Sequence, residues 1–421
     1  MTDPAMNSKS NVGAFLTLCS VGLFARLSYA MARTPVLALF ALHLGARPEA
    51  IGLVVGISTV TGIFFKLPAG VLSDILGRRS LLIAGLCVFA FVPFGYIFVD
   101  GVWDLVVIRF FHGFATAIYG PVAMATIADV AKQKKAEQLS WFSSITIIGT
   151  LCGAPAGGFL LWWLPGSEGA ALSDFHLIYT IIGGFGVIAL ILAITRLGAL
   201  KPGEVAKGEH KSFSEVYQRF ISGVKELISD RDVVITSSME GLQNMTLGAL
   251  EAFLPVYAVT IAGLNAFQAG ALWGIQIVVT LVAKPIMGRI ADRFGRKPLI
   301  VCGMIFCAVA FIFIPTVTTF IWLAALAILF GFGEAFVTSS AAAMVADMCE
   351  EKHYGAAMGT FGTIYDVGHA SGPIAAGLLL AAFSGDYFLA FLPLGIVLLL
   401  GCALFAFTTT ERKLSDGNSG Q

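Results

Sequence analysis

The chain has 421 residues, of which 57% are hydrophobic and 12% are charged, and its formal net charge at pH 7 is zero. This composition excludes a water-soluble fold, because the charged residues are too few to form a polar shell around an apolar core. We therefore expect a protein of the lipid bilayer. Nothing in the charge pattern indicates a surface for nucleic acid.

Twelve long apolar runs follow one another along the chain, and a membrane helix needs about 20 such residues. Their continuous Gly-, Ala- and Leu-rich composition favours helices over barrel strands, which are short and alternate in polarity. The chain is therefore predicted to be an all-α membrane protein with twelve transmembrane helices. The predicted spans lie at 13–43, 49–73, 80–99, 102–131, 138–163, 175–197, 232–262, 266–289, 297–315, 318–347, 354–383 and 387–409.

The 26 lysine and arginine residues are sorted by the predicted side of the membrane. Twenty of them lie in the two tails, in the even-numbered connections or at the span ends that adjoin these connections, whereas only Arg47 lies in an odd-numbered connection. Cytoplasmic loops carry the excess of basic residues in membrane proteins. We expect both termini to be cytoplasmic and the protein to reside in the inner (cytoplasmic) membrane.

The two halves of the chain repeat one pattern in a constant register, which matches Gly70 with Gly288 and Asp129 with Asp347. Parallel repeats of this kind are typical of transporters whose two halves move around a central site. The predicted organisation is an N-terminal six-helix bundle at 1–197, a cytoplasmic linker at 198–231 and a C-terminal six-helix bundle at 232–421. Apolar residues recur at helical spacing within the linker, which predicts an amphipathic helix on the membrane surface.

A loop motif stands after the second span and again after the eighth. Its glycines permit a tight turn, and its aspartate can pair with a nearby arginine, so the loops are predicted to act as a breakable cytoplasmic latch. The motif comprises Gly70, Asp74, Gly77, Arg78 and Arg79 in the first copy, and Gly288, Asp292, Arg293, Gly295, Arg296 and Lys297 in the second.

This motif, Gly-x-x-x-Asp-x-x-Gly-Arg-Arg/Lys, resembles the loop motif of the major facilitator superfamily. Together with the twelve spans, the resemblance covers essentially the whole chain. It implies the major facilitator fold, in which two six-helix bundles are related by a pseudo-two-fold axis. It also implies a secondary transporter that works by alternating access.

The fifth span carries small residues at every fourth position together with a proline, namely Gly149, Gly153, Pro155, Gly157 and Gly158. This run resembles a motif of the drug/proton antiporter branch, although Pro155 stands one place later than in that motif. A similar run in the eleventh span includes Gly368, Gly372 and Pro373. Close helix packing alone would also select such residues, so both interpretations stay open.

Ionisable residues inside the spans are costly, at about 2.5 to 3.5 kcal/mol each for a charged side chain at the centre of a membrane helix. They therefore face a cavity or pair with one another. The basic members are Arg26, Arg33, Lys66, Arg109 and Lys284, and the acidic members are Glu240, Glu251, Glu334 and Asp366. We expect Lys66 and Lys284 to extend to the cytoplasmic edge.

Arg109 and Gly113 form an Arg-x-x-x-Gly pattern that resembles a family motif linked to proton coupling. The alternative is an arginine that faces the lipid headgroups at the outer edge of the fourth span.

Asp366 is the first candidate for carrying the proton, because it lies midway along its span and the first half has Ile148 at the matching position. Burial raises the pKa of a carboxyl group and lets it exchange a proton near neutral pH. Glu334 and Glu240 are alternatives for the same role. Tyr365 and His369 flank Asp366 and are candidates for the substrate cavity.

Arg26 and Arg33 are two helical turns apart and share one helix face. Relatives in the drug-exporter branch place an acid in this span, so arginines here favour an anionic or zwitterionic substrate. Internal pairing with Glu251 or Glu334 is the alternative. Glu251 is itself a candidate for lining the substrate cavity.

The leading prediction for function is a proton-coupled exporter of a small organic molecule, which is a drug or a metabolite. The alternative is a proton-linked importer or exchanger of an organic anion. No nucleophile and base stand at a defensible spacing, so we expect no enzyme activity and no cofactor. The seven cysteines show no metal-ligand spacing, so we expect no metal, and we expect a monomer.

Overall fold

The structure is a computed structural model that describes residues 4–131, 135–164, 170–197, 218, 231–348 and 354–409. Within these ranges the regular structure is entirely helical and no strand occurs. The amphipathic helix predicted for the linker at 198–231 lies almost wholly outside the described residues.

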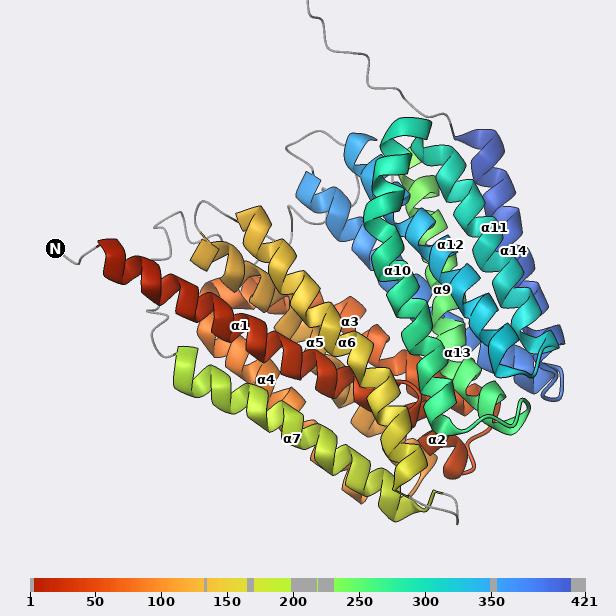
Figure 1. The fold of residues 1–421 in the computed structure, drawn as a ribbon, viewed down its shortest axis with the longest axis horizontal. Coiled ribbons are helices and arrows are strands. Elements are labelled where there is room, and N and C mark those ends of the chain that lie inside the picture. The colour runs from red at the N-terminus through yellow and green to blue at the C-terminus, as the bar shows by residue number, and fades with distance from the viewer. Residues whose placement is uncertain are drawn as a thin grey trace, which may run out of the picture. The chain divides into compact units, whose positions relative to one another are not determined.

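The described residues form twelve long helices, as the twelve apolar runs predict, together with the short helix α2 (Figure 1). In the first half these are α1 (Pro4–Arg33), α2 (Val36–His43), α3 (Pro48–Leu76), α4 (Arg78–Gly95), α5 (Val102–Ala131), α6 (Lys135–Trp163) and α7 (Leu172–Arg196). In the second half they are α9 (Arg231–Thr260), α10 (Ala266–Phe294), α11 (Arg296–Phe313), α12 (Phe320–Met348), α13 (Tyr354–Ala382) and α14 (Tyr387–Thr408). Short 3-10 helices follow α4 and α11, at Tyr96–Phe98 and Ile314–Thr316.

Ten of the described helical segments are long and apolar enough to cross a membrane. Helices α9 and α13 are equally long but are not among the ten. They carry three of the four acidic residues that the sequence places inside spans, Glu240, Glu251 and Asp366. The buried carboxylates of these two helices therefore need an explanation.

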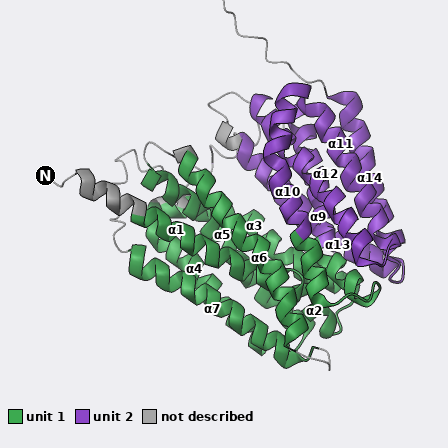
Figure 2. Ribbon diagram, viewed as in Figure 1, with its two compact units in different colours: residues 1–213, 251–274 green, residues 214–250, 275–421 purple. Residues whose placement is uncertain are grey.

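The chain divides into two compact units (Figure 2). Unit 1 comprises residues 1–213 and 251–274, and unit 2 comprises residues 214–250 and 275–421. Helices α9 and α10 therefore contribute residues to both units. The six-helix bundles with boundaries at 197 and 232 stay a prediction from the sequence.

Within unit 1, α1 packs along α6 and α7, while α5 packs against α3 and α4 (Figure 1). The glycines of α6 permit this close approach to α1. A Cβ atom would lie 2.5 Å from the Leu23 carbonyl oxygen at Gly149, 2.9 Å from the Met31 amide nitrogen at Gly153 and 2.9 Å from the Met31 carbonyl oxygen at Gly157. Pro155 and Gly158 of the same run contact the residues 266–274 that belong to this unit.

Within unit 2, α11 packs against α12 and α14, and glycines of α13 lie against α9. A Cβ atom at Gly368 would overlap Gly241, and one at Gly372 would overlap Met245. The glycine runs of the fifth and eleventh spans therefore take part in helix packing in both units.

Candidate functional site

The two motif loops have the same backbone geometry. Gly77 connects α3 to α4 with φ of 90°, and Gly295 connects α10 to α11 with φ of 93°. This left-handed region is strained for any residue with a side chain, which explains a glycine at both turns. A Cβ atom at Gly70 would lie 4.0 Å from Pro121 Cβ, and one at Gly288 would meet no atom within 4 Å. Crowding by neighbouring atoms therefore does not explain the glycine at either position.

The arginine that follows each turn glycine forms an ion pair with the end of another helix of its own unit. Arg78 donates from Nε to Asp129 Oδ2 of α5 at 3.1 Å. Arg296 Nη1 lies 2.6 Å from Asp347 Oδ2 of α12. The two ion pairs thus occupy equivalent positions in the two halves of the repeat.

The motif aspartate of the second copy lies near an arginine, as the sequence predicts. Asp292 lies 3.7 Å from Arg296, and its side chain is 72% exposed. The side chain of Asp74 lies outside the described residues. Asp129 and Asp347 are further functional candidates, and the sequence alone assigned them no role. Their matching positions in the two halves of the repeat are the signal that could have identified them as partners of the motif arginines.

We predict that Asp347→Asn lowers the transport rate roughly fivefold, since a partly exposed ion pair contributes up to about 1 kcal/mol. Asp292→Asn is the matched control in the same unit and should have a smaller effect, because its longer contact is screened by water. Initial transport rates in proteoliposomes, normalised to the amount of inserted protein, measure both. Equal rates in the two variants would contradict a latch built on the Arg296–Asp347 pair.

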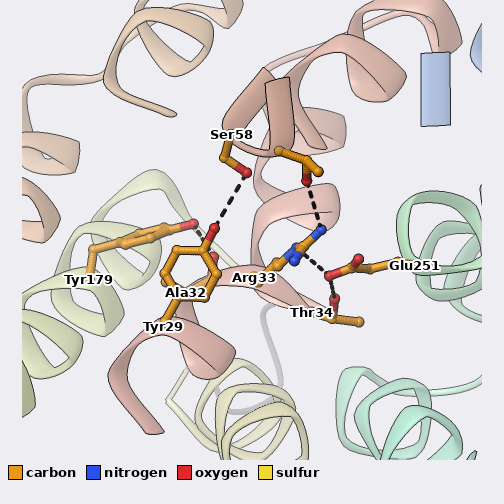
Figure 3. Close-up of polar contacts among 8 residues, drawn as sticks. Tyr29, Ala32, Arg33, Thr34, Ser58, Tyr179 and Glu251 are labelled. Atoms are coloured by element: carbon orange, nitrogen blue, oxygen red, sulfur yellow. Dashed lines mark hydrogen bonds and ion pairs between the residues drawn. The ribbon is translucent and has the colours of Figure 1, made fainter. Parts of the chain in front are cut away.

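Arg33 forms a buried ion pair with Glu251 of α9, inside unit 1 (Figure 3). The Thr34 hydroxyl donates to the same carboxylate oxygen, Glu251 Oε1, at 3.1 Å. Arg33 Nη2 also donates to Thr59 Oγ1 of α3 at 3.5 Å. Of the two interpretations that the sequence left open for Arg33, this geometry favours internal pairing.

Arg26 does not share this contact. It lies two turns earlier on α1, where its charge acts on the Tyr119 hydroxyl of α5 and its Cβ atom faces Gly149 of α6. The two arginines share a helix face by spacing, but the neighbouring helices give them different surroundings.

Arg109 is completely buried in unit 1, with 0% of its surface exposed. It does not face lipid headgroups, which was the alternative that the sequence left open. Its guanidinium carbon lies 5.2 Å from the centre of the Tyr29 ring, and His112 follows one turn later on the same helix. The polar cluster around Arg109 is therefore internal to the helix bundle.

The charge of a single lysine acts on two glutamates of unit 2. Glu240 of α9 and Glu334 of α12 interact electrostatically with each other, and Lys284 of α10 acts on both carboxylates. The charge of Lys284 thus acts on both carboxylates, and the extension of its side chain to the cytoplasmic edge stays a prediction from the sequence.

Hydrogen bonds hold both carboxylates in place. Gln276 Nε2 donates to Glu334 Oε2, and the Thr280 hydroxyl donates to the same atom at 3.0 Å. Asn244 Nδ2 donates to Glu240 Oε1 at 3.2 Å. Glu240 is 0% exposed, and Gln243 and Asn244 beside it on α9 are as deeply buried.

Asp366 is also buried, at 7% exposure, and lies on α13 of unit 2. The rings of Tyr365 and His369 meet edge to face with their centres 6.0 Å apart. Asp366 is not among the groups whose charge acts on Glu240 or Glu334. The structure thus brings Glu240 and Glu334 together, while Asp366 lies on another helix of the same unit.

Among the side chains that the structure describes, no three His, Cys, Asp or Glu residues stand together in a way that could hold a metal ion. The described sites therefore consist of ion pairs, hydrogen-bonded carboxylates and aromatic rings.

The family model "Major Facilitator Superfamily" matches residues 18–283 and 274–421 of the chain. The chain belongs to the major facilitator superfamily. It is accordingly a multi-pass membrane transporter and not an enzyme, as the sequence predicted.

Several relatives of this superfamily member resemble it along most of its length. An uncharacterised MFS-type transporter of Methanocaldococcus jannaschii is 24% identical over 370 residues, which cover 87% of this chain and 89% of the relative. The multi-drug resistance efflux pump PmrA of Streptococcus pneumoniae is 22% identical over 382 residues, or 88% of each chain. The multidrug transporter MdfA of Yersinia pestis is 23% identical over 281 residues, covering 65% of this chain and 64% of that protein.

Solved structures confirm the major facilitator fold. The nucleoside transporter NupG superposes with a TM-score of 0.78 at 14% identity, covering 94% of this chain and all of NupG. A bacterial homologue of the human lysosomal transporter Spinster superposes with a TM-score of 0.74 at 13% identity, covering 96% of this chain and 97% of the homologue. At this identity the likeness extends to the fold alone.

Proposed function

We propose that this transporter exports a small organic molecule, a drug or a metabolite, in exchange for protons. It works by alternating access, as a monomer in the inner membrane with both termini in the cytoplasm. The names of the relatives PmrA and MdfA as multidrug transporters support efflux. The sorting of lysine and arginine between the predicted loops supports the orientation.

The observation that carries the proposal is the buried pair Glu240 and Glu334 with Lys284. Two ionised carboxylates and one ammonium group leave one negative charge in excess. An excess charge is costly inside the bilayer, so the cluster favours binding one positive charge. A single proton meets this need, and its release requires only a change in water access to one of the carboxylates.

Asp366 is the second candidate for the proton site, and it is the one that the sequence ranked first. It is buried on α13 of the same unit. The proposal places the proton on the glutamate pair, because repulsion between two neighbouring carboxylates favours the state in which one of them is protonated.

We predict that Glu240→Gln and Glu334→Gln each abolish transport driven by a pH gradient, because a glutamine amide cannot take up and release a proton. Exchange of substrate for substrate without a gradient should persist. The assay uses proteoliposomes with an imposed pH gradient and a mixed panel of drugs and metabolites. Asp366→Asn is the matched comparison in the same unit.

Retained gradient-driven transport in both glutamine variants, together with its loss in Asp366→Asn, would reassign the proton site to α13. Retained coupling in all three variants would contradict proton coupling through unit 2.

The alternative function is proton-linked import or exchange of an organic anion. Arg26 and Arg109 favour it as in-span cations, whereas the pairing of Arg33 with Glu251 weakens it. The same substrate panel distinguishes the two functions, since only the alternative requires organic anions to be the preferred substrates.

A further inference from the structure

A cluster of polar aromatic residues surrounds Arg109 inside unit 1. Tyr29 of α1 lies against the guanidinium group, and the ring of His112 meets the Tyr29 ring edge to face at 5.3 Å. Tyr96 and Tyr179 stack on each other with their ring centres 3.8 Å apart, and the Tyr96 ring also meets the ring of His112. All five side chains are buried, and only Tyr29 is more than 2% exposed.

This Arg109 cluster has more hydrogen-bond donors than acceptors. Arginine carries five N–H groups and no acceptor. The Tyr96 hydroxyl interacts with Arg109 as a hydrogen-bond partner, but no described residue accepts from Nε, Nη1 or Nη2 of Arg109 with the distance and angle of a regular hydrogen bond. Buried N–H groups nearly always have an acceptor, so this many without one is a feature that requires an explanation.

His112 adds a further donor in the tautomer that carries its proton on Nε2. Its Nδ1 atom lies 3.0 Å from the Tyr96 hydroxyl, while its Nε2 atom is buried and has no hydrogen-bond partner among the described residues. When the Tyr96 hydroxyl donates to Nδ1, the proton of the neutral imidazole stands on Nε2. That proton belongs to the same helix face as Arg109, since the two positions are one helical turn apart.

The charge of Arg109 also lacks a carboxylate. The groups whose charges act on it are the hydroxyls of Tyr29, Tyr96 and Tyr179, and no acidic side chain of the described part of the chain is among them. By contrast, Arg33, Arg78 and Arg296 each pair with an acid. The face of the Tyr29 ring stabilises part of the guanidinium charge by a cation–π interaction. A ring face does not accept a regular hydrogen bond from the N–H groups.

We propose that Arg109 and His112 form a binding site for one small monovalent anion, a carboxylate group or a halide ion. The planar guanidinium group can donate two parallel hydrogen bonds to a carboxylate or several to a halide, and His112 Nε2 supplies another. The surrounding tyrosine rings exclude water, which strengthens the attraction. This site goes beyond the proposed function, which requires a proton and an organic substrate but no bound anion.

The test is thermal unfolding of the purified full-length protein at constant pH and ionic strength. Sodium chloride, sodium bromide and sodium benzoate are titrated against sodium sulfate, which controls for general salt effects. The unfolding temperature of the wild type should rise with anion concentration and follow the binding law for one site. A response to chloride and bromide alone identifies a halide site, and a response to benzoate alone identifies a carboxylate site.

Arg109→Gln should remove the saturable rise, whereas Arg26→Gln, which deletes another in-span charge of unit 1, should retain it. The same rise in Arg109→Gln, or its loss in Arg26→Gln instead, would overturn the proposal. The absence of any saturable rise in the wild type would overturn it as well.

A second measurement covers the case in which Arg109→Gln does not fold. Arg109→Lys keeps the charge but loses the planar fork, so the apparent affinity should fall at least about tenfold. Crystals of the wild type grown in sodium bromide, or with 4-bromobenzoate for a carboxylate site, should show an anomalous bromine peak beside Arg109. Unchanged affinity in the lysine variant and no peak at this position would exclude the site.

Discussion

Glu251→Gln should destabilise the protein by about 3 kcal/mol, because Arg33 then stays inside the helix bundle without a carboxylate. The Glu251 side chain is 4% exposed and that of Arg33 is 18% exposed, so water has little access to replace the lost partner. The loss also removes the acceptor of the Thr34 hydroxyl. Thermal unfolding in detergent or nanodiscs, calibrated by chemical denaturation, measures the change.

The double variant Arg33→Gln/Glu251→Gln should be more stable than the sum of the single variants predicts, because neither side chain is then an unpaired charge. Such a coupling is what a double-mutant cycle detects for residues in direct contact. Arg26→Gln combined with Glu251→Gln is the control and should be additive. Additive effects for Arg33 and Glu251 would contradict internal pairing and would return Arg33 to the role of a substrate ligand.

Gly372→Ala should cost about 3 kcal/mol, the upper part of the usual range for overpacking. A Cβ atom at this position would overlap the Met245 carbonyl oxygen of α9 and would lie 2.9 Å from the Ala249 amide nitrogen. Both neighbours are backbone atoms, so relief requires α9 and α13 to move apart. Unfolding temperature and the yield of folded protein measure the effect.

Gly362→Ala is the matched control, because Gly362 lies on the same helix and an added Cβ atom there meets nothing within 4 Å. It should be neutral or stabilise by up to about 1 kcal/mol, since alanine is the better helix former. Equal losses in the two variants would show that close packing between α9 and α13 is not what Gly372 provides.

The sequence by itself determined the class of fold. A backbone in hydrocarbon must satisfy its hydrogen bonds within each segment, so runs of about 20 apolar residues are read as helices without further information. It also determined the repeat, because a constant offset along the chain is a property of the sequence alone. The sequence also predicted the turns at Gly77 and Gly295. A left-handed backbone conformation favours glycine whatever the surrounding structure, so the residue type alone indicates it.

The tertiary structure alone decided which charged residues meet. Arg33 and Glu251 lie in different halves of the chain, and the sequence offered both Glu251 and Glu334 as partners for an arginine on α1. Arg109 was placed by the sequence either at a functional site or at the headgroups, and only the packing of α5 among its neighbours shows that it is buried. Helical spacing assigns a side chain to a face of its own helix, but which helix covers that face depends on long-range packing.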